Sequence, residues 1–224
     1  MGAVVGELLP LALGVAISPM SIIAVILMLL APRAGGTSLG FLLGWLAGIL
    51  VATGLCVWLA SATGLGEGGQ PKASSSWIKL VLGLLLIVLA AREWRSRPGP
   101  GRQAELPKWM ATIDSFTPGK AAGLGLALAA VNPKNLTMCV AAGVAIAESG
   151  LAAGQTVFLV ALFTILAGCS VAVPVIAHAV AAARMRGPLA RLKQWLQANN
   201  STVMAVLLLV IGVVLFGKGL GGLF

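Results

Sequence analysis

Residues 16–21 read AISPMS, and residues 130–135 read AVNPKN. Each stretch lies near the middle of a long apolar run, and the two prolines, Pro19 and Pro133, are 114 positions apart. Proline removes one backbone donor and breaks a helix. We therefore expect two membrane helices that are each broken near mid-depth. Their freed carbonyl groups need partners from the protein, because lipid offers none.

The composition is that of a membrane protein. Of 224 residues, 59% are hydrophobic and 9% are charged, and the mean hydropathy is +1.02. The formal charge of +9 would suggest a nucleic-acid partner in a soluble protein. Here the charges lie between apolar runs, which favours membrane topology and contact with anionic lipid headgroups, and we expect no nucleic acid as a partner.

Six apolar runs approach or exceed the roughly 20 residues that a helix needs to cross a bilayer. The predicted fold class is thus an all-α membrane protein with six transmembrane helices. The predicted spans are residues 4–30, 38–62, 76–91, 119–147, 155–181 and 201–219.

The matching proline segments predict an internal repeat. With three helices in each half, the second half enters the membrane from the opposite side, which is the inverted repeat common in secondary transporters. We expect a first repeat over residues 1–95, a basic cytoplasmic linker with an amphipathic segment over 96–118, and a second repeat over 119–224. The first helix of each repeat is the broken one.

The basic residues predict the orientation. The loops after helices one, three and five carry eleven lysines and arginines, against three on the opposite side. Because basic loops stay in the cytoplasm, both termini should face outward from a bacterial inner membrane. Within the two basic loops, apolar residues at helical spacing predict amphipathic helices on the inner leaflet, one at Trp109–Phe116 and one at Leu189–Leu196.

Lys134 is the strongest candidate for a functional residue. It lies about 20 Å into the membrane by helical rise, where a lysine is costly unless it is paired or hydrated. The pattern shows no acid at comparable depth, which indicates a water-filled cavity or an anionic substrate. The hydrogen-bonding residues beside the prolines either complete this site or only satisfy the broken backbone. The predicted substrate-binding set is Lys134, Asn132, Asn135, Pro133, Ser18, Pro19 and Ser21.

Three acids are candidates for a gate or a coupling site. Glu7 opens the first helix and Glu148 closes the fourth, both at the outer ends, and Asp114 lies just before the fourth helix. The alternative is that such interfacial carboxylates are only solvated. Separately, Gly40, Gly44 and Gly48 form a GxxxGxxxG face that permits close helix packing, within one chain or between two.

Several stretches resemble the glycolipid-addressing (sulfolipid-addressing) membrane proteins of actinobacteria, distant relatives of the lysine-exporter superfamily. The resemblance covers nearly the whole chain and implies a role in moving cell-envelope lipids or similar compounds. Amino-acid exporters are also similar, but their first motif is like Pro-Gly-Pro, where this chain has Ser18, Pro19 and Met20. The matching stretches are residues 107–110, 113–114, 117–118, 132–136, 141–143, 174–175 and 195–196, together with Asn199.

The sequence thus predicts a transporter or flippase that exports a polar or anionic small molecule or a cell-envelope glycolipid. One alternative is a non-transporting scaffold for a larger lipid exporter or synthase, and another is an amino-acid exporter. A hydrated cavity at Lys134 would distinguish a transporter from a scaffold, because a scaffold can fill that space with side chains. We expect no enzyme activity, cofactor or metal. Expected partners are membrane lipids and the substrate, with a homo-oligomer or larger lipid-export machinery left open.

Overall fold

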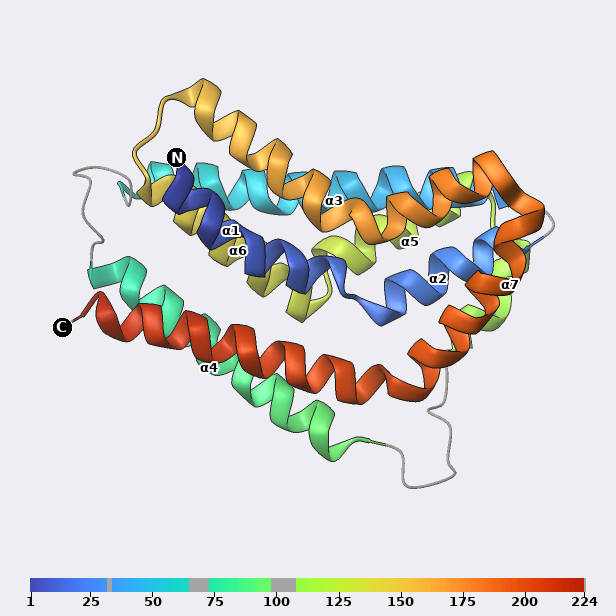
Figure 1. The fold of residues 1–224 in the computed structure, drawn as a ribbon. Helices are drawn as coiled ribbons and strands as arrows, with labels where there is room; N and C mark the ends of the chain where they lie inside the picture. Colours follow the sequence, from blue (N-terminus) through green and yellow to red (C-terminus); the bar gives the residue numbers. More distant parts are fainter. Residues whose placement is uncertain (32–33, 65–72, 98–107, 224) are drawn as a thin grey trace.

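The computed structural model describes residues 1–31, 34–64, 73–97 and 108–223, and these form helices joined by short breaks and turns, with no strand among them. Figure 1 shows the helices as one bundle with both termini at the same end. The elements are α1 (Gly2–Ala16), α2 (Pro19–Leu30), α3 (Ala34–Ala62), α4 (Ala73–Arg95), the 3₁₀ helix η1 (Lys108–Ser115), α5 (Pro118–Ala130), α6 (Pro133–Glu148) and α7 (Ala153–Gly221).

Both predicted helix breaks are confirmed. The axes of α1 and α2 differ by 53°, and those of α5 and α6 differ by 64°. Pro19 and Pro133 each occupy the first turn of the second helix in their pair. Proline suits that position, because its fixed φ is helical and its missing N–H would have no partner there anyway.

The chain is a multi-pass membrane protein. Four helical segments are long and apolar enough to cross a membrane, and the number rises to six if each bent pair is one span. The four are α3, α4 and two segments of α7, Ala153–Ala182 and Arg184–Gly221, which are separated by a kink beside the non-helical Ala181. The α4 helix is longer than the predicted third span, which begins at residue 76. The second segment of α7 is longer than the predicted sixth span, which begins at residue 201.

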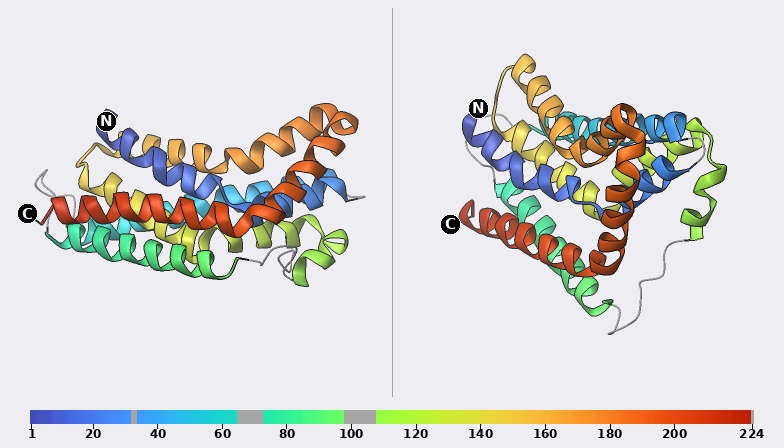
Figure 2. Two further views of the ribbon diagram at one scale, coloured as in Figure 1. Left: turned by 60° about the horizontal axis from the view of Figure 1, so that its bottom comes forward. Right: turned by 45° about the vertical axis from the view of Figure 1, so that its right-hand side comes forward.

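The two ends of the bundle differ. One end, here called the terminal end, holds both termini and the turn between α6 and α7 (Figure 1). The opposite end, here called the linker end, holds the C-terminal part of α4, η1 and the bend of α7 (Figure 2). Residues 98–107 of the predicted linker lie outside the described residues, as do Arg33 and Lys72 of the charge asymmetry.

The two predicted amphipathic segments both lie at the linker end but are more embedded than expected. The first is the 3₁₀ helix η1, which packs against α2 and buries Met110 and Ile113 in the main core. The second is continuous with α7 and crosses the linker end before the chain turns back (Figures 1 and 2). It buries Leu189 and Leu196. Apolar periodicity predicts a buried face but cannot distinguish a lipid surface from a neighbouring helix.

The glycine face of α3 packs within the chain, against α5. A Cβ added at Gly40 or Gly44 would meet the backbone of Pro118 or Ala122 in α5, and Gly125 of α5 lies equally close to the backbone of α3. The α4–α7 contact is of the same kind, because a Cβ at Gly83 would lie 2.5 Å from the Phe216 backbone nitrogen. Glycine is required at these contacts because the two backbones leave no room for a side chain.

Replacing Gly44 with alanine should destabilise the protein. The added methyl group meets the Ala122 backbone, and overpacking of this kind costs about 1–3 kcal/mol. Gly54→Ala is the matched control on the same helix, since nothing lies within 4 Å of its added Cβ. Thermal unfolding in detergent should show a lower midpoint for Gly44→Ala only. Equal midpoints for the two variants would contradict the close α3–α5 contact.

Candidate functional site

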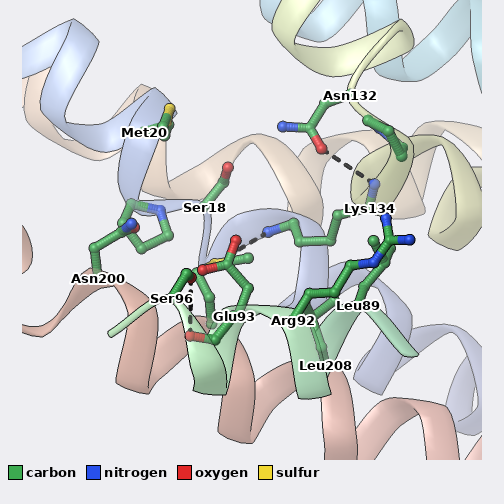
Figure 3. Close-up of a pocket in the computed structure, with 13 residues that line it drawn as sticks. Ser18, Met20, Leu89, Arg92, Glu93, Ser96, Asn132, Lys134, Asn200 and Leu208 are labelled. Carbon is green, nitrogen blue, oxygen red and sulfur yellow. Dashed lines mark hydrogen bonds between the residues drawn. The ribbon is translucent and has the colours of Figure 1, made fainter. Parts of the chain in front are cut away.

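A cavity of about 340 Å³ lies where the two helix breaks meet (Figure 3). Its wall combines the α1–α2 junction, the C-terminal part of α4, the start of α6 and the second segment of α7. Lys134 and Ser18 are buried in this wall, whereas Arg92 and Ser96 are exposed, so the cavity reaches the surface near the end of α4. It is lined by Ser18, Pro19, Met20, Leu89, Arg92, Glu93, Ser96, Asn132, Pro133, Lys134, Asn200, Met204 and Leu208.

The Lys134 ammonium group binds the end of α1. Its Nζ donates hydrogen bonds to the Gly14 carbonyl at 2.9 Å and the Ile17 carbonyl at 3.1 Å. Gly14 O is free to accept because the Ser18 amide bonds to Ala16 O instead. A cation is also favourable at a helix C-terminus, where the macrodipole is negative. Lys134, which lies in the C-terminal half of the chain, therefore satisfies carbonyl groups that the α1–α2 break leaves free in the N-terminal half.

The third donor of Lys134 has only a weak partner in the cavity wall. Its nearest partner is the Met204 sulfur at 4.0 Å, a weak acceptor. The residue is only 5% exposed, and both Lys134 and Met204 line the cavity. The lysine is thus held by the backbone and also presented to the cavity.

Glu93 is an acid that the sequence analysis missed. We expected no carboxylate near the depth of Lys134, but Glu93 lines the same cavity, and Figure 3 shows its carboxylate pointing toward the ammonium group. The two charges interact electrostatically without a direct ion pair. Glu93 is hidden in the sequence because it stands in the basic run that ends α4, between Arg92 and Arg95, and so resembles an interfacial charge.

Arg92 and Asn200 are further lining residues that the sequence did not single out. In the sequence, Arg92 is one of the basic residues that predict the orientation in the membrane. In the structure, its side chain lines the mouth of the cavity. The Asn200 side-chain oxygen is buried, and no described group donates a hydrogen bond to it. A bound ligand or water with a donor would satisfy it.

The predicted substrate-binding residues fall into two groups. Ser18, Pro19, Asn132, Pro133 and Lys134 all line the cavity. Asn132 also caps α6, its side-chain oxygen accepting from the Lys134 amide at 3.1 Å.

Ser21 and Asn135 are buried behind the cavity wall. Ser21 donates to the Ser18 hydroxyl at 3.2 Å. Asn135 donates from Nδ2 to the Leu128 carbonyl at 2.8 Å, which satisfies the end of α5. The structure thus gives Asn135 the backbone-satisfying contact that the sequence left open as an alternative to substrate binding, whereas Ser21 bonds to a neighbouring side chain.

Two of the three predicted gate or coupling acids meet at the terminal end. Lys79 of α4 lies 2.6 Å from Glu148 of α6 and 3.7 Å from Glu7 of α1, and Lys218 of α7 lies 3.0 Å from Glu7. These four residues, here called the terminal ion cluster, join four helices. Glu7 and Glu148 are therefore paired with lysines and are not merely solvated. The side chain of Asp114, the third candidate, lies outside the described part of the structure.

Removing Lys79 should destabilise the protein more than removing Lys218. Lys79 is 10% exposed and serves two carboxylates, whereas Lys218 is 40% exposed and serves one. Breaking a buried pair costs about 3–5 kcal/mol, against about 0–1 kcal/mol for an exposed pair. Thermal unfolding of Lys79→Met and Lys218→Met in detergent measures the difference. Similar midpoints would mean that the cluster does not hold the helices together.

Comparison with known proteins identifies the family. A protein family described as "Sap, sulfolipid-1-addressing protein" matches residues 8–221, which is nearly the whole chain. No curated protein and no solved structure matches it. The family description links the chain to lipid handling, and the apolar helices place it in a membrane. The predicted resemblance is therefore confirmed, and the chain belongs to the Sap, sulfolipid-1-addressing protein family.

Proposed function

We propose that this protein is an inner-membrane transporter or flippase that moves the polar or anionic group of a cell-envelope lipid, or a similar small molecule. The observation that carries this proposal is the cavity at the helix breaks, where Lys134 and Arg92 face open volume between membrane helices. A volume of about 340 Å³ suits a headgroup or a small molecule rather than a whole lipid.

The charges in the cavity favour a binding role. A stable fold alone needs no charged side chain inside a membrane bundle, and such residues commonly mark substrate pathways. The side chain of Arg92 forms no hydrogen bond or ion pair with any residue that the structure describes, so its planar guanidinium group is available for an oxyanion. Together with the third donor of Lys134, it offers two cationic contacts to one anionic group.

The terminal ion cluster supports alternating access. The cavity is lined by the α1–α2 junction, α2, α4, α6 and α7, and the cluster joins α1, α4, α6 and α7 at the opposite end. We infer that the described conformation is open at the linker end and closed at the terminal end. Glu7 and Glu148 act as the gate, and Lys79 is the cation that holds it shut. Release of the substrate at the terminal end then requires these ion pairs to separate.

The proposal includes the inverted repeat. The broken pair α1–α2 runs from the terminal end to the linker end, and α5–α6 runs the opposite way (Figure 1). Each pair is followed by two long segments. This order supports two three-helix repeats related by a pseudo-two-fold axis, as in secondary transporters and the lysine-exporter superfamily. Because basic loops stay inside, the linker end is assigned to the cytoplasm and both termini to the outside.

A scaffold for a larger lipid exporter or synthase is the second candidate. The observation that favours it is the binding of Lys134 to the carbonyls of Gly14 and Ile17, which gives the lysine a structural role without any substrate. A scaffold does not need Arg92, however, because that side chain lines the cavity and holds no helix in place.

Arg92→Gln should abolish most transport while leaving stability unchanged. We expect lipid movement in proteoliposomes to slow by about tenfold or more, since a charge-assisted hydrogen bond contributes about 1.5–3 kcal/mol. The assay follows fluorescent phosphatidylglycerol by dithionite quenching. Arg95→Gln is the matched control, because Arg95 lines a separate apolar groove beside Trp94.

Lys134→Met is the companion variant. It should lose transport as well, but it should also lower the unfolding midpoint, because two carbonyls at the end of α1 lose their donor. Wild-type protein without lipid movement, or an Arg92→Gln variant as active as Arg95→Gln, would favour the scaffold.

Reporter fusions at Gly101 and Ala152 should report opposite sides of the membrane. The charge asymmetry of eleven basic residues to three predicts Gly101 in the cytoplasm and Ala152 outside. Alkaline phosphatase, which is active only outside, and green fluorescent protein, which is fluorescent inside, give complementary signals. Phosphatase activity at Gly101 would reverse the orientation and assign the cavity to the outer side.

A further inference from the structure

Glu93 differs from the other acids whose side chains the structure describes. Glu7 and Glu148 each have a lysine nitrogen within 4 Å, at 3.0 Å and 2.6 Å respectively. Glu93 has no such partner, although it is partly buried in a membrane-spanning helix and lines a cavity with two cations. Its carboxylate points toward Lys134, whose strongest hydrogen bonds go to Gly14 and Ile17 (Figure 3).

Because Glu93 lies in the cavity, the net charge of the cavity depends on whether Glu93 is ionised or protonated. With Glu93 ionised, Arg92, Lys134 and Glu93 sum to a charge of +1; with Glu93 protonated, the sum is +2. The other elements that border the cavity add no titratable group among the described residues. The α1–α2 junction contributes Ser18, Pro19 and Met20, and α7 contributes Asn200, Met204 and Leu208.

We propose that Glu93 is a proton-binding selectivity residue that competes with an anionic substrate group for Lys134 and Arg92. This inference rests on the proposed function, in which the cavity binds such a group. When the anion enters, it brings a second negative charge into a small, partly buried volume, where like charges repel strongly. Glu93 then takes a proton from water, its carboxylate becomes a neutral carboxyl, and the cavity keeps its net charge.

The direction of the effect follows from linkage. Protonated Glu93 does not repel the anion, so the anion binds more tightly as the pH falls. By the same coupling, the bound anion raises the proton affinity of Glu93. The site therefore loads an anion and a proton together, and it discriminates against an anion when Glu93 is ionised.

The test measures equilibrium binding in nanodiscs. The probe is phosphatidylglycerol with a dansyl label on an acyl chain, compared with the same label on zwitterionic phosphatidylcholine, with energy transfer from tryptophan as the signal. Between about pH 8 and pH 5, wild-type affinity for the phosphatidylglycerol probe should rise about tenfold, the effect of a coupling of one pKa unit. The phosphatidylcholine probe should show no such change.

Two variants of Glu93 and one control isolate the effect. Glu93→Gln should bind the phosphatidylglycerol probe tightly at both pH values, because it cannot ionise. Glu93→Asp should keep the pH dependence, and so should Arg95→Gln. Infrared difference spectra provide a second readout, since a protonated carboxyl band should grow on probe binding in wild type and be missing in Glu93→Gln.

The outcomes separate the inference from the function on which it rests. If wild type binds phosphatidylglycerol no better than phosphatidylcholine at either pH, and Arg92→Gln changes nothing, the cavity is not an anion site and the proposed function fails. If Arg92→Gln weakens preferential binding but the pH dependence persists in Glu93→Gln, the role of Glu93 is wrong and the anion site stands.

Discussion

The structure depends on satisfying the carbonyl groups that two broken helices leave inside a membrane. Two adjacent residues in the first turn of α6 do this for both breaks. Lys134 donates to Gly14 and Ile17 at the end of α1, and Asn135 donates to Leu128 at the end of α5. An unsatisfied backbone group in lipid costs several kcal/mol, so these contacts fix how the breaks meet. The cavity lies at that meeting point.

The position of the cavity therefore follows from the breaks, and its chemistry follows from α4 and α7. The α4 helix contributes Arg92 and Glu93, and α7, which packs against α4, contributes Asn200 and Met204. A buried cation that is bound to carbonyls but also lines the cavity can respond to what enters that cavity. A structural role and a binding role for Lys134 are thus compatible, because different donors of the same ammonium group serve them.

Much of the fold could be predicted from the sequence, because proline and apolar length act locally. Pro19 and Pro133 mark the breaks, and the apolar runs mark the spans. Half of the cavity was predictable for the same reason, since Ser18, Asn132 and Lys134 adjoin the prolines. Glu93 and Arg92 were not, because their role depends on how α4 packs against the breaks. Likewise, Lys79 is joined to Glu148 across 69 positions, a pairing that no local pattern encodes.

The glycine contacts define which parts of the bundle can move independently. In the α3–α5 pair, and again where α4 meets the second segment of α7, helix backbones touch with no flexible side chains between them. Each pair joins one helix from the N-terminal half to one from the C-terminal half. A change of shape that opened the terminal end would therefore carry α3 with α5, and α4 with α7. In such a motion the moving units would be these interlocked pairs, rather than the two consecutive halves of the chain.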